Sequence, residues 1–184
     1  MEETSVSVIG ILIASIILFI VPLIMIADRS DDISQLIAQS ATTEFVDEVI
    51  KSGKITTDSY EDFVNSLQSS GNTYDIEMEV KILDKNTAKR PTDISDGAII
   101  GENSYYSIFT SQIEDKIGIS AGQTDYNKLG QLILKQGDEI LVTVKNSSKT
   151  LSQSLKSFYY DVKGEDLHII SATATGTIAI NGAT

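Results

Sequence analysis

Residues Val6 to Ala27 read VSVIGILIASIILFIVPLIMIA, and this stretch decides the fold. It runs for about 22 residues without a charge, and a helix needs roughly 20 apolar residues to cross the hydrocarbon core of a bilayer. The competing interpretation is a secretory signal peptide, which has a basic start, a shorter apolar run and a small-residue cleavage site. Because Glu2 and Glu3 precede the run and Asp28 follows it, we interpret the segment as a retained transmembrane helix.

One proline and several small residues interrupt the apolar run. Pro22 removes a backbone donor, which predicts a kink or a locally loosened helix. Membrane helices tolerate proline, and the alternative interpretation is that a helix with such a weak point packs among copies of itself. Gly10, Ala14 and Ser15 lie at close to helical spacing and would let another helix approach on one side. Gly10, Ala14 and Pro22 are therefore candidates for an assembly surface.

The helix is predicted to continue beyond the membrane as an amphipathic stem. No Gly or Pro separates the stem from the apolar run, and Gly53 is typical of a helix stop. One helix from Val6 to Lys51 would be roughly 70 Å long at 1.5 Å per residue. Thr42 and Glu48 are expected to face solvent, while an apolar stripe lies against the head or another subunit. The predicted stripe comprises Ile33, Leu36, Ile37, Ala41, Phe45, Val49 and Ile50.

The rest of the chain predicts a β-rich head. Tyr74 to Ile82 alternates apolar and charged residues, which is typical of a strand in an antiparallel sheet covered on one side. Before it, Asp58 to Leu67 reads as a short helix in which Asp58 and Glu61 are spaced like a capping box. Gly176 is expected to mark a bulge in the last strand. The other expected elements are strands at 105–110, 132–134, 139–145 and 167–180 and a helix at 151–158.

Composition argues against several functional classes. The chain has 26 Asp and Glu against 14 Lys and Arg, for a net charge of -12, so a nucleic acid would be repelled. It has no cysteine and one histidine, His168, which removes thiolate chemistry and leaves the commonest metal ligand almost absent. His168 is expected to be an ordinary strand residue. Asp28, Asp31 and Asp32 miss the spacing of a calcium loop and are expected to form a solvated acidic collar. We predict no enzymatic activity and no cofactor.

An apolar helix with an internal proline, continuing into an amphipathic stem and an acidic β-rich head, resembles type IV pilins and the pilin-like subunits of Tad-type systems. The stretch from Ser40 to Val80, with TTEFVDEVIKSGKITTDSYEDF and SGNTYDIEMEV, is also similar to uncharacterised pilin-like proteins of Tad-like or conjugation-like gene clusters in Gram-positive bacteria. The resemblance covers about the first 80 residues. It implies a structural subunit of a type IV pilus-like extracellular filament.

The resemblance also implies partners and a location. The chain would be a single-pass membrane protein before assembly and part of a cell-surface filament afterwards. Its partners would be other copies of itself, membrane lipid before assembly, and the pilus or secretion assembly machinery. The alternative is a single-pass membrane-anchored accessory or binding protein of a secretion or conjugation-like machine.

In type IV pilins a glutamate near the mature N-terminus is thought to pair with a neighbouring subunit's terminal amine. Glu2 and Glu3 are the positions of this chain that can take that role, although they precede the apolar run, whereas pilins usually place theirs inside it. The alternative is that they interact with the helix N-terminus, where the dipole favours anions.

The sequence therefore predicts an α+β chain of 184 residues in which a long N-terminal helix packs on an antiparallel β-sheet head, as in pilins. The transmembrane helix is expected over residues 1–27, the stem helix over 28–52 and the head domain over 53–184.

Overall fold

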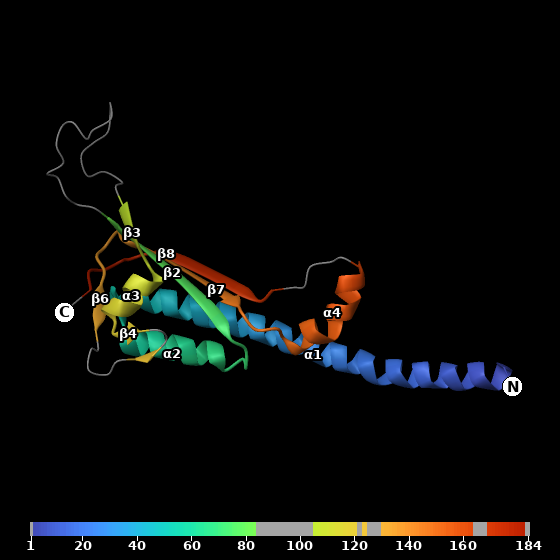
Figure 1. Cartoon of the computed structure of the whole chain (residues 1–184). Coiled ribbons are helices and arrows are strands. Elements are labelled where there is room, and N and C mark those ends of the chain that lie inside the picture. The colour runs from blue at the N-terminus through green and yellow to red at the C-terminus, as the bar shows by residue number, and fades with distance from the viewer. Residues whose placement is uncertain (1, 84–104, 121–122, 125–129, 164–168, 183–184) are drawn as a thin grey trace, which may run out of the picture.

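The structure is a computed structural model. It describes residues 2–83, 105–120, 123–124, 130–163 and 169–182. Side chains are described for the same residues except 2–4, 120, 123–124 and 158–163. His168 therefore lies outside the described residues. The predicted fold class is confirmed at the level of architecture, because a long N-terminal apolar helix packs on an antiparallel sheet in an α+β arrangement (Figure 1).

Helix α1 dominates the chain. It spans Glu2–Ser52 and contains Pro22 without an interruption of its helical structure. Its first half extends away from the head, while its second half lies along the head (Figure 1). The helix ends where Gly53, with φ of 68°, donates its N–H to the Val49 carbonyl at 2.8 Å. Glycine adopts this left-handed conformation without steric cost, so the predicted helix stop is confirmed.

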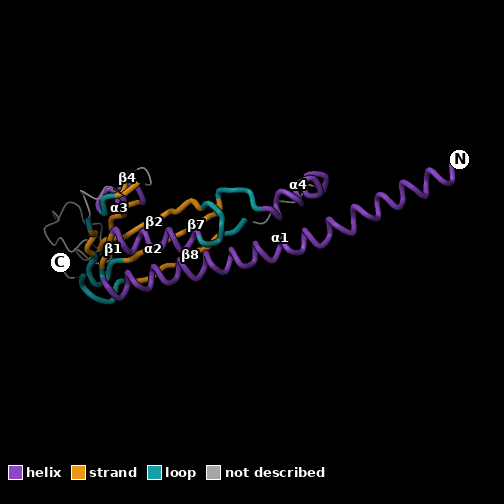
Figure 2. Tube along the Cα trace, turned by 90° about the horizontal axis from the view of Figure 1, so that it is seen from below, coloured by secondary structure: helices purple, strands orange, loops and turns teal. Residues whose placement is uncertain are grey.

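The head is built on one antiparallel sheet with strand order β3-β2-β7-β8. Val80 of the central strand β2 lies opposite Ile108 of β3 and Ile140 of β7, and all three side chains are buried. Figure 2 shows α1 running along the sheet. The predicted alternation of β2 is confirmed. The strands are β2 (Tyr74–Leu83), β3 (Tyr105–Phe109), β7 (Glu139–Asn146) and β8 (Ser171–Thr177).

Shorter elements complete the head. Strand β1 follows α1 directly and pairs antiparallel with β6, which ties the end of the long helix to residues 131–133. Helix α4 begins at the middle of α1, apart from the rest of the head, and points away from α1 (Figure 1). These elements are β1 (Lys54–Thr56), α2 (Thr57–Gln68), α3 (Thr110–Lys116), β4 (Ile119–Ser120), β5 (Gln123–Thr124), β6 (Gln131–Ile133) and α4 (Leu151–Lys163).

The N-terminus of α2 corrects one prediction. The Thr56 hydroxyl accepts the Ser59 N–H at 3.1 Å, and the Ser59 hydroxyl accepts the Thr56 N–H at 3.1 Å. This is a capping box two residues before the predicted one, so the assignment of Asp58 and Glu61 to that role is wrong. Asp58 instead lies in the first helical turn, where the helix dipole favours a negative charge.

Three aromatic rings join α1 to α2. Phe45 stacks on Phe63 with ring centroids 4.6 Å apart, and Tyr60 meets both rings edge-on. The Tyr60 hydroxyl donates to the Glu114 carboxylate of α3 at 2.9 Å. Burial, followed by the nearby Glu114 charge, raises the pKa of Tyr60, so this phenol stays a neutral donor. The cluster connects three helices through the core.

The stem turns a face of small residues toward the head. Ser34, Ala38 and Thr42 are all buried, and the Thr42 hydroxyl donates to the Ala38 carbonyl at 2.6 Å. The prediction that Thr42 faces solvent is therefore wrong. Its hydroxyl tolerates burial because a hydrogen bond within the helix satisfies it. Small side chains on this face leave room for the backbone of α1 to approach its neighbours closely.

Strand β8 is shaped to receive this helix. Ala172, Ala174 and Gly176 point toward the covered face of the sheet, whereas the residues between them are exposed. Gly176 pairs with Ile140 in regular register, so the predicted bulge is wrong. A Cβ at Gly176 would lie 2.2 Å from Cδ1 of Ile50. Glycine is needed here for the contact between helix and strand.

Replacing Gly176 by alanine is expected to lower the free energy of unfolding by about 1–3 kcal/mol, because the added methyl group overpacks this contact. Denaturant unfolding of the full chain measures the loss. Ile50→Val removes the closest atom, so the double variant should recover part of the stability that Gly176→Ala loses. A neutral Gly176→Ala variant would contradict the close approach.

Candidate assembly surface

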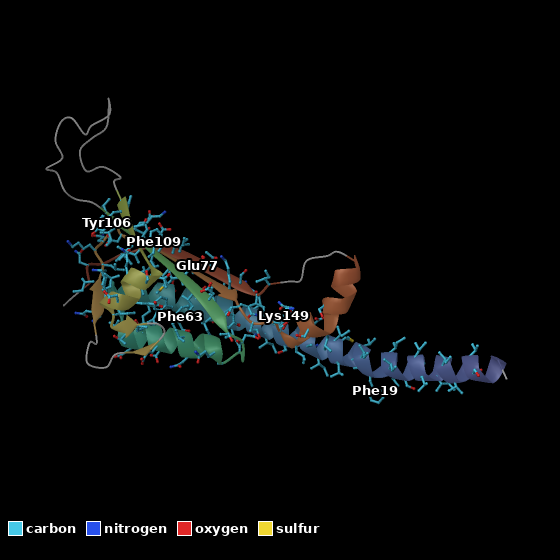
Figure 3. The ribbon with its side chains drawn as sticks, viewed as in Figure 1. Phe19, Phe63, Glu77, Tyr106, Phe109 and Lys149 are labelled. Atoms are coloured by element: carbon cyan, nitrogen blue, oxygen red, sulfur yellow. The ribbon has the colours of Figure 1, made fainter. Side chains whose placement is uncertain are left out.

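The first half of α1 is apolar and bare. The most apolar 18-residue window of the helix has none of its residues buried, and the helix is long and apolar enough to cross a membrane. The side chain of Phe19, for example, is 72% exposed (Figure 3). A continuous apolar surface of this size fits contact with lipid or with other protein surfaces. The exposed large side chains are those of Val6, Val8, Ile9, Ile11, Leu12, Ile13, Ile16, Ile17, Leu18, Phe19, Ile20, Val21, Leu23, Met25 and Ile26.

The residues predicted for assembly within this half lie on its open surface. Ala14 and Pro22 are exposed, and a Cβ built on Gly10 would have no neighbour within 4 Å. Another helix could therefore approach Gly10 closely. Glu2 and Glu3 lie in the first turn of α1, and their side chains are outside those described.

The predicted stem stripe divides into two faces. Phe45 and Val49 are 3% and 0% exposed in the core of the chain itself, which places them out of reach of another subunit. Ile33 and Leu36 are 59% and 65% exposed, and Ile37 is half-buried. The expected stripe therefore packs on the head only in part. Ile33 and Leu36 are instead exposed on the outer side of the stem, where the polar residues 28–32 separate them from the apolar run.

The exposed apolar side chains on this side of the stem end at Leu36. An open groove follows along α1, and its carboxylates give it an acidic character. Lys51 lies 3.5 Å from Asp47, and both side chains are mostly exposed, so the pair contributes at most about 1 kcal/mol. The groove is lined by Leu36, Gln39, Ser40, Thr43, Glu44, Asp47, Glu48, Lys51 and Ser52.

The acidic residues that follow the apolar segment, Asp28 and Asp31, bind helix α4. Asp28 accepts hydrogen bonds from Lys156 and from the Ser152 hydroxyl, and Asp31 accepts one from the Thr150 hydroxyl at 2.8 Å. The bond from Lys156, followed by that from Ser152, lowers the pKa of Asp28. The prediction of a solvated acidic collar is wrong for these two carboxylates, because they hold α4 on α1.

Contact between α4 and α1 is expected to weaken in acid. A lowered pKa in the folded state means that ionised Asp28 stabilises the fold above its unfolded pKa of about 3.9, and that this stabilisation is lost as the pH falls through the lower folded value. Amide-exchange protection in α4 should therefore drop below about pH 4. Asp28→Asn should show weak protection at neutral pH as well, whereas Asp75→Asn on the exposed side of β2 should behave like the unaltered chain. Equal protection at both pH values would contradict this role for Asp28.

In the part of the chain that the structure describes, no group of three or more His, Cys, Asp or Glu side chains is placed to hold a metal ion. The surface offers apolar contact along α1 and polar contact at the collar. Comparisons with protein-family models, with curated proteins and with solved structures found no match.

Proposed function

We propose that this chain is a structural subunit of a type IV pilus-like extracellular filament. In this proposal α1 anchors the subunit in a membrane before assembly and then bundles with copies of itself, while the heads tile the outside. The observation that supports it is the bare apolar surface of α1 from Val6 to Ile26, together with the exposed apolar side chains of Ile33 and Leu36 further along the helix. Burying apolar surface contributes roughly 25 cal/mol per Å², so a helix bundle is sufficient to hold such a filament together.

The partners in this proposal are other copies of the chain, membrane lipid before assembly and the pilus or secretion assembly machinery. No enzymatic step, cofactor or nucleic acid is part of it. A carboxylate carried into an apolar bundle needs a partner, because an unpaired charge there costs several kcal/mol. Glu2 or Glu3 would pair with the terminal amine of a neighbouring subunit.

Electron microscopy of sheared cell-surface material tests the proposal, with an antibody against the head to identify the chain. The expected result is labelled filaments. A chain that is well expressed and stays in the membrane fraction, with no labelled filament, would overturn it.

Replacing Leu36 by glutamate is expected to reduce filament yield at least several-fold while leaving the fold intact. Leu36 is 65% exposed, so its replacement should change the free energy of unfolding by under about 0.5 kcal/mol. A charge on a surface that packs against a neighbour, in contrast, has to be desolvated. Yield in sheared material, relative to membrane level, measures the effect. Thr175→Glu, on the exposed side of β8, is the control, and equal yields from both variants would exclude this surface from assembly.

A second candidate function is a single-pass membrane-anchored accessory or binding protein of a secretion or conjugation-like machine. It is favoured by the packing of Phe45 and Val49 inside the core of the same chain, because a stem covered by its own head does not need a second subunit. Under this alternative, Leu36→Glu would change neither membrane level nor cellular location, and no filament would form.

A further inference from the structure

Helix α4 begins against α1 at the edge of the bare apolar half and then leads away from it (Figure 1). Thr150, at its start, donates to Asp31, and residues further along it, Ser152 and Lys156, donate to Asp28. As α4 advances along the chain, its contacts therefore move back along α1 toward the N-terminus. Figure 1 shows α4 at the middle of α1, between the head and the bare half.

This direction brings α4 to the last turns of the apolar segment. Ala27 is 1% exposed and Ile24 is half-buried, although the residues around them are exposed. Ile24, Ala27, Asp28 and Asp31 follow a spacing of three and four residues, which puts them on one side of the helix. That is the side to which α4 binds. If α1 crosses a membrane, the apolar run meets the lipid headgroups near Ala27, so α4 lies at the same level.

Two exposed leucines lie on one side of α4. Leu151 and Leu155 are 63% and 37% exposed and lie one turn apart on the same side of the helix. Ser152 and Lys156 are directed to Asp28, so their side of the helix is already occupied. Lys149, just before the helix, is exposed (Figure 3). Exposed leucines with an adjacent lysine are typical of helices that lie in the membrane interface.

We propose that α4 is an interfacial helix whose Leu151 and Leu155 insert into the headgroup region of the bilayer that α1 crosses. The position of α4 along α1 favours lipid as the occupant of this surface. Ser152 and Lys156 bind Asp28, the residue that directly follows the apolar run. The exposed leucines of the same helix therefore lie at the level where the run leaves the hydrocarbon core.

The inference rests on α1 as a membrane anchor and is independent of filament formation. Asp28 has a positional role in it, because its bonds to Ser152 and Lys156 hold α4 at the level of the headgroups. With α1 crossing the bilayer and α4 lying on it, the head is attached at two places and keeps a fixed orientation to the membrane.

Site-directed labelling of the full chain tests the proposal, because the chain contains no cysteine of its own. Leu155→Cys and Ser157→Cys each carry one environment-sensitive fluorophore, in vesicles of phosphatidylcholine and phosphatidylglycerol. Ser157 is the matched control, since two residues turn an α-helix by about 200°. Quenching by nitroxide-labelled lipid should be at least about twofold stronger at position 155 than at 157, and quenching by aqueous iodide should show the opposite order. Leu151→Cys should behave like Leu155→Cys. If the change at Leu155 disturbs the fold, quenching at position 151 is compared with quenching at position 157 instead.

The outcomes separate this inference from the proposed function. A chain that does not float with the vesicles overturns both the anchor and the interfacial helix. A chain that floats but shows equal lipid quenching at positions 155 and 157 overturns the interfacial helix alone. Comparing vesicles that hold one copy of the chain with vesicles that hold many copies identifies the occupant. Equal lipid quenching at position 155 in both samples supports lipid. Quenching that differs between them shows that a second copy covers this surface and overturns the proposal.

Discussion

Replacing Phe45 by alanine is expected to lower the free energy of unfolding by about 3–5 kcal/mol, through lost transfer free energy and the cavity left behind. The ring is 3% exposed and stacks on Phe63 at 4.6 Å between centroids. It also meets Tyr60 edge-on. The side chain therefore holds α1 and α2 together inside a single chain, and its loss should be felt without any second subunit.

Thermal unfolding of the full chain in detergent, followed by the near-ultraviolet signal of its tyrosines, measures the Phe45→Ala loss. Glu48→Ala is the control on the same helix, because an exposed side chain of this kind should change stability by under about 0.5 kcal/mol. A loss below about 1 kcal/mol for Phe45→Ala, combined with failed filament formation, would mean that the ring packs on a neighbouring subunit.

Removal of residues 1–27 is expected to abolish stable membrane anchoring while leaving a folded, monomeric head, because two exposed leucines of α4 alone would bind a bilayer only weakly. The exposed apolar side chains from Val6 to Ile26 contribute little to the core, and Asp28 and its bonds to α4 remain. What is lost is the segment that is long and apolar enough to cross a bilayer. Vesicle flotation and size-exclusion chromatography measure the two effects. A stable large oligomer of the shortened chain would show that the heads, rather than α1, drive association.

Local sequence signals identified the main elements correctly. The apolar run, the missing helix breakers and Gly53 predict both the extent and the end of α1, because these are properties of neighbouring residues. The alternation from Tyr74 to Ile82 predicts β2 for the same reason. Both signals repeat over several helical turns or several pairs of strand residues, so one residue that breaks the pattern does not change the predicted element.

Apart from the misplaced capping box of α2, the errors concern contacts between distant residues. A period near 3.6 residues shows that the stem is amphipathic. It cannot decide which apolar residues meet the head, and in the structure Ile33 and Leu36 remain exposed. The burial of Thr42 depends on the packing of α1 along the head, whose strand β8 lies far along the chain. The bond from Thr150 to Asp31 spans 119 residues, so the local spacing of the acidic residues gave no sign of it.

The pairing of the first and last elements of the fold constrains how the chain is made. The stem face of α1 is synthesised first, and β8, which packs against it, is among the last segments to leave the ribosome. At about 5–20 residues per second, roughly 6–25 s separate Ser52 from Thr177. During that interval α1 can already enter a membrane, while Val46 and Ile50, which lie against Gly176 of β8, have no final strand to pack on. Biosynthesis of this protein therefore has to keep the stem from aggregating until the final strand arrives.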